Sequence, residues 1–530
     1  MTNQTLKLSI ALAATLAAAA CNDRPEIYEK PLVVHGPFNI DKRVMWVDGT
    51  RGRVTSLDPL ATAPTTRSVG ISRNVSAAVP SNNGKELLIL TGGKEALRKD
   101  QKAEDPALTV IAASAKGPEV KNRYPLPSAF DQLAVSADGR FVVAHYSSKT
   151  NQNSAVFRNP NEIALLDLKE PPSKTNPIIR TLRSFGSAPL GVVFSPSMKI
   201  PVKDGPARTL ALVLSRNYIT FVDMDKRTRK EITLPLIPAG STKSIMPQQV
   251  LFAPKQARVF IRATGAADIY AVALEAKTAD GNAGNDYRPQ INQPSAGNPI
   301  DFMTIYDDPA TSKTMILGTT GTNAVLIDAD TSEFTTIKIG EPVDTIIAIP
   351  AEAPTQALLY SSRLPRSRIH ILSLERLDER REANLTSRTL ANEVREVLAM
   401  PDNKQALVVH DDNRAVVSIL DLVGEHRTDT PIQGRLPLTN FGFIGKSHLV
   451  GVAPGNKRVG IIDLANLHAT DLRLDHSPQR VVVIDQTIVV DHGSLLGLAT
   501  IIPKIDAGRE KSRVLWGFLF DGLLDRGLKD

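Results

Sequence analysis

One phrase recurs about ten times along this 530-residue chain: an apolar run, a short turn, and a second apolar run that often ends in aspartate. Its clearest copy is Arg140–Tyr146 followed by Ile163–Asp167. Short runs rich in Val, Leu, Ile and aromatic residues are typical of strands. Because all-β units at a fixed period indicate a closed or stacked repeat, the chain is predicted to be all-β, a single large β-propeller.

The spacing of the phrase predicts the size of each unit. Successive second strands are separated by roughly 40 to 56 residues, the length of a four-stranded blade. Ten hairpins indicate ten blades, whereas propellers of seven or eight are commoner. A blade shared by the two chain ends would lower the count by one, and stretches such as 94–107, 147–161 and 276–298 could be loop insertions. We therefore expect about eight to ten blades, with seven plus insertions as the alternative.

The unit containing residues 132–167 carries a resemblance to a known family. The segment Gln132–Arg140 ends in Ser-Ala-Asp-Gly-Arg, in which Asp138-Gly139 is a strong tight-turn signal, and Ile163–Asp167 follows. This order resembles the YVTN/YncE-like (WD40-like) propeller family, whose units read strand, Ser-Pro-Asp-Gly-Arg, strand, turn, strand ending in Asp. The resemblance covers roughly residues 40–505, and the tetrapeptide that gives the family its name is absent. It implies the propeller fold.

The N-terminus is typical of an export signal. Lys7 supplies a positive charge, and Leu8–Ala20 is an apolar run too short to span a bilayer comfortably. The sequence Ala18-Ala-Ala-Cys21 resembles a bacterial lipobox, although leucine is usual where Ala18 stands. We interpret residues 1–20 as a lipoprotein signal peptide and Cys21, the only cysteine, as the lipidated residue. An ordinary signal peptide with an incidental thiol, giving a soluble exported propeller, is the alternative.

The remaining sequence divides into three parts. Residues 21–40 are interpreted as the lipidated N-terminus and a polar tether, 41–510 as the propeller, and 511–530 as an amphipathic tail that either caps the propeller or docks on a partner or membrane. The net charge is +7, and loss of Lys7 with the signal peptide lowers it to +6. This excess suits anionic lipid headgroups or acidic polysaccharide, and the export signal argues against nucleic acid.

Aspartates end many of the second strands of the phrase. A carboxylate at that place accepts hydrogen bonds from the amides of the following turn, so we predict a structural role for them. The six positions are Asp58, Asp167, Asp223, Asp328, Asp421 and Asp463.

Histidines at comparable strand ends are the candidates for a metal site. His145, His410 and His492 would project from one face if the repeat alignment holds, with Asp411 and Asp491 beside them. Histidine and aspartate sets bind Zn or Cu. The alternative is that they are polar residues next to turns.

Basic residues are the candidates for contact with an anionic partner. Arg363, Arg366 and Arg368 are placed in a hairpin turn, where loops carry function, and a second cluster spans 226–230. A solvated surface is the alternative for both clusters.

Catalytic signatures are missing from the sequence: it has no Gly-X-Ser-X-Gly elbow, no phosphate-binding glycine loop and no His-Glu-X-X-His helix. We expect a membrane-anchored, non-catalytic binding or scaffold module of the bacterial cell envelope, on its periplasmic or surface side, with an envelope protein or polysaccharide as partner and no cofactor. The alternative is a propeller enzyme, a lactone hydrolase or metal-dependent oxidoreductase, with its site at the channel mouth.

Overall fold

The computed structural model describes residues 33–515 with short interruptions. The interruptions are 95–102, 148–158, 184–187, 203–204, 238–241, 267–268, 279–280, 282–283, 295–297, 309–310, 352, 365, 376–383, 411–415, 424–428, 434–437, 494–498 and 506–512. Cys21 and Asp411 lie outside the described residues, as do 1–32 and the tail from 516 onwards.

Ten antiparallel four-stranded sheets make up the described part, each formed by four consecutive strands in the order of the chain. Blades 1 to 5 consist of β1 (Val34–Ile40), β2 (Arg43–Asp48), β3 (Arg53–Leu57), β4 (Thr66–Gly70); β5 (Val75–Pro80), β6 (Glu86–Thr91), β7 (Ala107–Ser114), β8 (Gly117–Pro125); β9 (Gln132–Val135), β10 (Phe141–His145), β11 (Glu162–Asp167), β12 (Ile178–Thr181); β13 (Pro189–Phe194), β14 (Leu210–Ser215), β15 (Tyr218–Asp223), β16 (Ile232–Pro235); and β17 (Met246–Ala253), β18 (Arg258–Thr264), β19 (Tyr270–Ala276), β20 (Tyr287–Asn292).

Blades 6 to 10 repeat the same pattern. They consist of β21 (Phe302–Asp307), β22 (Thr314–Thr320), β23 (Asn323–Asp328), β24 (Phe334–Lys338); β25 (Thr345–Ile349), β26 (Gln356–Tyr360), β27 (Arg368–Ser373), β28 (Leu385–Thr389); β29 (Val394–Ala399), β30 (Gln405–His410), β31 (Val416–Asp421), β32 (Asp429–Gln433); β33 (Thr439–Ile444), β34 (His448–Ala453), β35 (Arg458–Asp463), β36 (His468–Arg473); and β37 (Arg480–Ile484), β38 (Thr487–Asp491), β39 (Ala499–Ile502), β40 (Arg513–Leu515). Short 3₁₀ turns, η3 (Pro254–Gln256) and η5 (Pro454–Asn456), join strands in blades 5 and 9.

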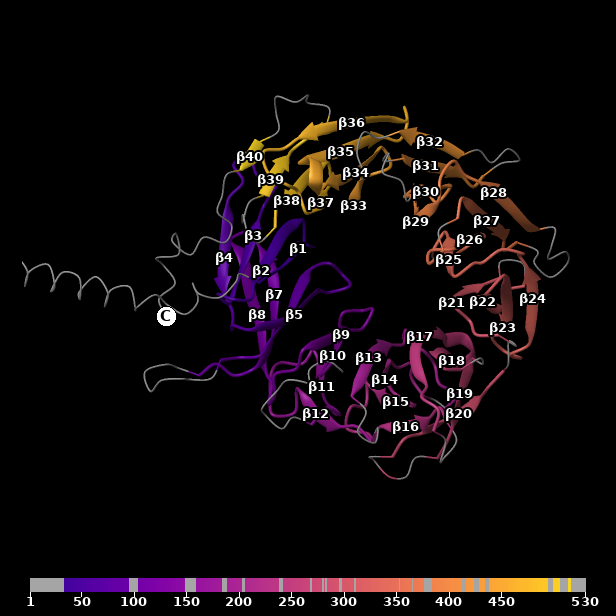
Figure 1. Cartoon of the computed structure of the whole chain (residues 1–530). Coiled ribbons are helices and arrows are strands. Elements are labelled where there is room, and N and C mark those ends of the chain that lie inside the picture. Colours follow the sequence, from indigo (N-terminus) through magenta and orange to yellow (C-terminus); the bar gives the residue numbers. More distant parts are fainter. Residues whose placement is uncertain are drawn as a thin grey trace, which may run out of the picture.

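The sheets follow one another around a ring, with the first strand of each blade nearest the axis and the fourth at the rim (Figure 1). This is a ten-bladed β-propeller. It confirms the all-β prediction and the upper end of the expected blade count, and the alternative of seven blades with insertions is wrong. The stretch 276–298, considered above as a loop insertion, contains the rim strand β20.

Apolar packing between neighbouring blades holds the ring together. The second and third strands of a blade are almost fully buried, as in β14 and β15. Among the described residues, buried apolar side chains form ten clusters, and each cluster joins one pair of adjacent blades. One cluster, which includes Trp46 of β2 and Val489 of β38, joins blade 10 to blade 1. The core is therefore continuous around the whole ring.

The ring closes without a shared blade. Blade 1 begins the ring with β1 and blade 10 ends it with β40, so both terminal sheets are complete from one segment each. The expectation that the chain ends could share a blade is wrong here. We call the contact between these two blades the closing junction. Besides its apolar cluster it contains Trp46, whose Nε1 donates to Asp491 Oδ1 at 3.1 Å, and an ion pair of 3.0 Å between Lys42 and Asp485.

The ends of the ring lie beyond the propeller limits expected from the sequence. β1 begins at Val34, inside the stretch interpreted as the tether, and pairs with β2. β40 at Arg513–Leu515 pairs with β39, inside the stretch interpreted as the tail. Within the described residues, no helix has the length and apolar character needed to cross a bilayer.

The strand order gives the ring two distinct faces. Because successive strands run in opposite directions, the turns between second and third strands lie on the same face as the connections between blades. We call this the linker face. The turns between first and second strands and between third and fourth strands lie on the other face, which we call the hairpin face.

Candidate functional site

The aspartates that end third strands serve the fold on the hairpin face. In each of the six, the carboxylate accepts a backbone N–H two or three residues later, as in Asp167 Oδ1 with the Lys169 amide at 3.0 Å. This confirms the predicted structural role. The corresponding donors are the amides of Leu60, Lys169, Lys226, Asp330, Val423 and Ala465.

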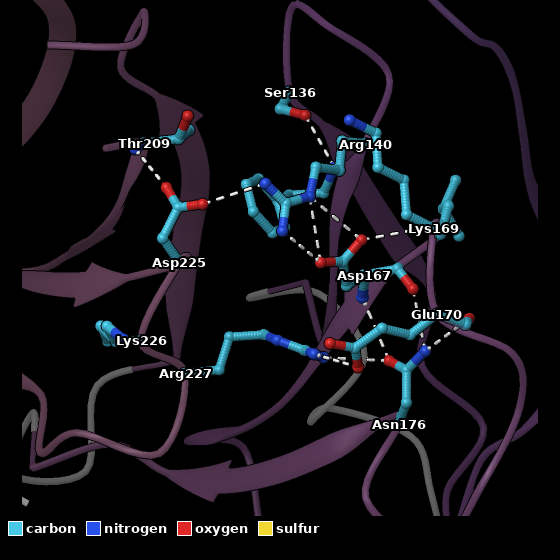
Figure 2. Close-up of polar contacts among 12 residues, drawn as sticks. Ser136, Arg140, Asp167, Lys169, Glu170, Asn176, Thr209, Asp225, Lys226 and Arg227 are labelled. Atoms are coloured by element: carbon cyan, nitrogen blue, oxygen red, sulfur yellow. Dashed lines mark hydrogen bonds and ion pairs between the residues drawn. The ribbon is translucent and has the colours of Figure 1, made fainter. Parts of the chain in front are cut away.

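Charged groups of the hairpin face also join neighbouring blades (Figure 2). Arg140 of blade 3 contacts Asp167 Oδ2 at 2.7 Å and reaches across to Asp225 of blade 4 at 3.0 Å. In return, Arg227 of blade 4 donates to Asn176 Oδ1 at 3.0 Å in blade 3. The hydrogen bonds with Asp167 raise the pKa of Arg140. These charged side chains therefore bind to one another and join blade 3 to blade 4.

A buried ion cluster does the same between blades 4 and 5. Arg208, which is 4% exposed, contacts Asp223 at 3.1 Å and Asp286 at 2.8 Å, and Arg229 contacts Asp286 at 2.7 Å. Burial raises the pKa of Asp223 in spite of Arg208. The basic cluster at 226–230 is thus at least partly structural, since Arg227 and Arg229 both pair with carboxylates of the ring.

A hollow on the hairpin face is also lined by cations that are engaged in ion pairs. Its volume is about 450 Å³ and it lies between blades 1 and 2. Its two cations are paired: Arg43 contacts Asp58 at 3.0 Å, and Lys42 contacts Asp485 at 3.0 Å. Both cations therefore already have a carboxylate partner within the ring.

The three candidate histidines lie at the linker face, as the repeat alignment predicted, but they do not meet. His145 ends the second strand of blade 3, His410 that of blade 8, and His492 directly follows that of blade 10. His145 Nδ1 is 2.9 Å from the Tyr146 carbonyl oxygen. Within the described part of the chain, no three potential ligands gather to hold a metal ion. The described positions of these histidines agree with the alternative considered above, polar residues next to turns.

Two of the histidines have the same role inside their own blades. His410 Nε2 lies 2.7 Å from Ser418 Oγ, and His492 Nε2 lies 2.8 Å from Thr500 Oγ1. In both, Nδ1 faces a backbone carbonyl, at Glu393 and Ser477. A neutral imidazole fits this pattern, because Nδ1–H donates to the carbonyl while Nε2 accepts from the hydroxyl. Each histidine therefore links the second and third strands of its blade.

Burial gives these histidines a measurable effect on stability. It lowers the pKa of His145 and His492, so the unfolded chain takes up protons at a higher pH than the folded ring does. The histidine contribution is fully present above the ordinary value of about 6.5 and is lost as the pH falls below it. We expect the free energy of unfolding to fall between pH 7 and 5, and His492→Gln to reduce that fall. Urea denaturation at several pH values measures this, with the exposed His468→Gln as control. Equal pH dependence in wild type and His492→Gln would contradict it.

Asp491, also a metal candidate, belongs to the closing junction instead. Its carboxylate is buried and accepts the Trp46 indole N–H from blade 1. Burial raises the pKa of this carboxyl, with the Trp46 hydrogen bond opposing. Its partner lies 445 residues away in the sequence, so local spacing could not indicate this role.

The three candidate arginines lie on the linker face between blades 6 and 8, in and beside the turn from β26 to β27. Arg363 Nη1 donates to Asp301 Oδ1 at 3.0 Å, and Arg368 pairs with Glu341. Arg366 is exposed. Two of the three therefore pair with carboxylates on the connections that lead into blades 6 and 7.

Arg363 also lines a pocket of about 440 Å³ on the linker face, which we call the blade 5–7 pocket. Arg262 and Gly265 come from the end of β18, Asp301 from the connection before β21, and Arg363 from the turn after β26. The full lining is Arg262, Ala263, Thr264, Gly265, Ala266, Pro299, Ile300, Asp301 and Arg363.

Arg262 distinguishes this pocket. It is half-buried, and its Nε atom is buried without a hydrogen-bond partner among the described residues. Burial lowers the pKa of its guanidinium, Asp301 opposes that effect, and Arg363 adds repulsion. Arginine nevertheless stays charged at neutral pH. Arg262 was not among the residues predicted from the sequence, although a cation inside the apolar strand Arg258–Thr264 was a visible signal.

Gly265 shapes the wall of the pocket. Its φ is +88°, and a Cβ at this position would lie 2.4 Å from the Ser244 carbonyl oxygen. Only glycine fits both the backbone conformation and the space. The turn after β18 is therefore held close to the preceding connection, beside Arg262.

Comparisons with known proteins concern the fold alone. No family model matches the chain, and no curated protein matches it. Among solved structures, the chain is similar to dihydro-heme d1 dehydrogenase NirN in complex with DHE, at 12% identity and a TM-score of 0.38, over 82% of this chain and 74% of that one. It is also similar to the Dos1 propeller, at 10% identity and a TM-score of 0.41, over 68% of this chain and 89% of that one. A third similar structure is that of a eukaryotic initiation factor, at 12% identity and a TM-score of 0.42, over 88% of this chain and 91% of that one.

Proposed function

We propose that this chain is an exported, membrane-anchored β-propeller that acts as a non-catalytic binding module in the bacterial cell envelope, with the linker face as its binding face. The observation that carries the binding role is Arg262 on the linker face, which differs from the other pocket and surface arginines described above, including Arg363 and Arg368 of the same face. The hairpin-face arginines described above are engaged in ion pairs with aspartates of the ring, whereas Arg262 lines a pocket of the linker face with its buried Nε atom lacking a hydrogen-bond partner among the described residues. A pocket that holds two arginines and one aspartate has one positive charge in excess, which suits an anionic ligand.

The anchoring part of the proposal rests on the sequence before the ring. Residues 1–20 have the layout of a signal peptide, and the lipobox-like Ala18–Cys21 supplies an acylatable thiol. Each buried methylene of an acyl chain contributes about 0.8 kcal/mol, so two or more chains anchor a protein durably. The YVTN/YncE-like pattern of residues 132–167 agrees with the propeller fold on which the proposal rests. Its partner would be an envelope polysaccharide or an envelope protein.

The alternative is a propeller enzyme, a lactone hydrolase or metal-dependent oxidoreductase with its site at the channel mouth, and convergence of His145, His410 and the Asp491–His492 pair would have favoured it. They lie in blades 3, 8 and 10, and their polar atoms bond within the ring. The excess positive charge of the linker-face pocket therefore supports the binding role more directly than these residues support catalysis.

The anchoring is tested by replacing Cys21 with alanine. In cells fed a clickable fatty acid, the wild type is expected to carry the label and to sediment with membranes. Cys21→Ala is expected to lose the label and to leave the membrane fraction, because its anchor is gone. Replacing Ser9 with alanine, inside the signal peptide, is the control and is expected to change neither. Unlabelled wild-type protein, or equal membrane association of both forms, would contradict the anchor.

A further inference from the structure

We propose that the blade 5–7 pocket binds a singly charged carboxylate carried on a sugar-sized ring, a uronic acid. This inference rests on the proposed binding role and names the chemistry of the ligand. Its central observation is Arg262, which is half-buried in the pocket and whose buried Nε atom has no hydrogen-bond partner within the described residues.

The charges of the pocket set the charge of the ligand. Arg262 and Arg363 each contribute one positive charge, and Asp301 contributes one negative charge. Arg363 is already paired with Asp301 at 3.0 Å. One positive charge, that of Arg262, is therefore left to balance. A monoanion neutralises it, whereas a dianion would leave excess negative charge beside Asp301.

The form of the cation favours a carboxylate. A guanidinium presents its N–H donors in a planar fork that matches the two oxygens of a carboxylate. Such hydrogen bonds are strengthened where water is partly excluded, and Arg262 is half-buried. A bound carboxylate would thus relieve the cost of an unpaired cation in the pocket.

The rest of the pocket leaves room for the body of the ligand. Its volume of about 440 Å³ lies within the range of about 300–1,000 Å³ of small-molecule sites. Ala263, Ala266, Pro299 and Ile300 provide apolar surface, and Thr264 provides a hydroxyl at the exposed edge. Apolar walls with a few polar groups suit the carbon face and the hydroxyls of a pyranose ring.

The test is titration calorimetry of the purified chain with D-glucuronate, D-glucose, acetate and glucose 6-phosphate. We expect glucuronate to bind most tightly, since glucose lacks the charge, acetate lacks the ring, and glucose 6-phosphate carries a second charge. Arg262→Gln is expected to weaken glucuronate binding at least about 10-fold, the loss typical of a charged hydrogen bond. Arg262→Lys is expected to retain part of the affinity.

Two further variants make the result specific. Arg288→Gln, an exposed arginine on the rim strand of the same blade, is the matched control and should bind as the wild type does. Asp301→Asn raises the net charge of the pocket by one, so it should shift preference from glucuronate towards glucose 6-phosphate. A purely structural Arg262 would not produce that shift. Because the half-buried Arg262 lacks a hydrogen-bond partner at Nε and lies in the pocket with Arg363, Arg262→Gln should melt at or above the temperature of the wild type.

Three results would overturn the inference. They are no glucuronate binding at concentrations up to about 20 mM, equal binding by wild type and Arg262→Gln, or glucose binding as tightly as glucuronate. Each of these leaves the fatty-acid labelling of Cys21 unaffected. A failure of the carboxylate site can thus be distinguished from a failure of the proposed envelope anchoring.

Discussion

Replacing Arg208 with methionine is expected to lower the free energy of unfolding by about 3–5 kcal/mol. Methionine keeps much of the side-chain length but removes the charge that contacts Asp223 and Asp286 at 3.1 and 2.8 Å. The Asp223 side chain is 0% exposed, so its carboxylate would be left in the interior with only Arg229, at 3.6 Å, as counter-charge. The loss of one partner from a buried ion pair is costly because the other charge stays desolvated.

The matched control is the same replacement at a solvent-exposed pair. Arg288 contacts Glu275 at 3.0 Å, and both side chains are largely exposed. Exposed pairs contribute little, so Arg288→Met should change stability by at most about 1 kcal/mol. Urea denaturation followed by circular dichroism measures both. Arg208→Met with a cost no larger than that of Arg288→Met would show that the junction between blades 4 and 5 does not depend on the cluster.

Replacing Trp46 with alanine is expected to open the closing junction and to lower the free energy of unfolding by about 3–5 kcal/mol. Trp46 is fully buried between blades 1 and 10, and its Nε1 donates to Asp491. Since these blades are not consecutive in the chain and share no sheet, only packing and polar contacts hold them together. Trp46→Phe keeps most of the apolar surface and loses the donor, so it should cost less, about 1–3 kcal/mol.

Phe260 provides the matched control for the closing junction. It is a fully buried aromatic on the second strand of blade 5, packed against blade 6. Phe260→Ala should destabilise the ring by a similar amount, about 3–5 kcal/mol. It should not separate the blades, because the chain itself runs from blade 5 to blade 6. Small-angle X-ray scattering under native conditions should show expansion for Trp46→Ala alone. Identical scattering from both variants would contradict a ring closed at this junction by side chains.

The sequence was most informative where the interactions are local. The amide partners of the strand-end aspartates lie two or three residues away, so turn chemistry alone predicted them. The hairpin phrase predicted four-stranded blades for the same reason. The His410–Ser418 and His492–Thr500 bonds are also regular, since the hydroxyl lies eight residues after the histidine in both. That spacing was present in the sequence and could have indicated a structural role for these two histidines.

Features that depend on the curvature of the ring could not be predicted in this way. The closing junction brings together Trp46 and Asp491 from opposite ends of the chain. The blade 5–7 pocket combines Arg262, Asp301 and Arg363 from three consecutive blades, and their proximity depends on how the blades are tilted and spaced. Periodicity shows that blades exist, but it does not give the distances between side chains of different blades.

The intact mass of the mature chain, purified from cell membranes, tests the proposed envelope role most directly. Our account predicts a chain that begins at Cys21 and carries the added mass of its acyl groups. A mature chain without acyl mass, whether it begins at Cys21 or at another residue, would contradict a lipid-anchored module.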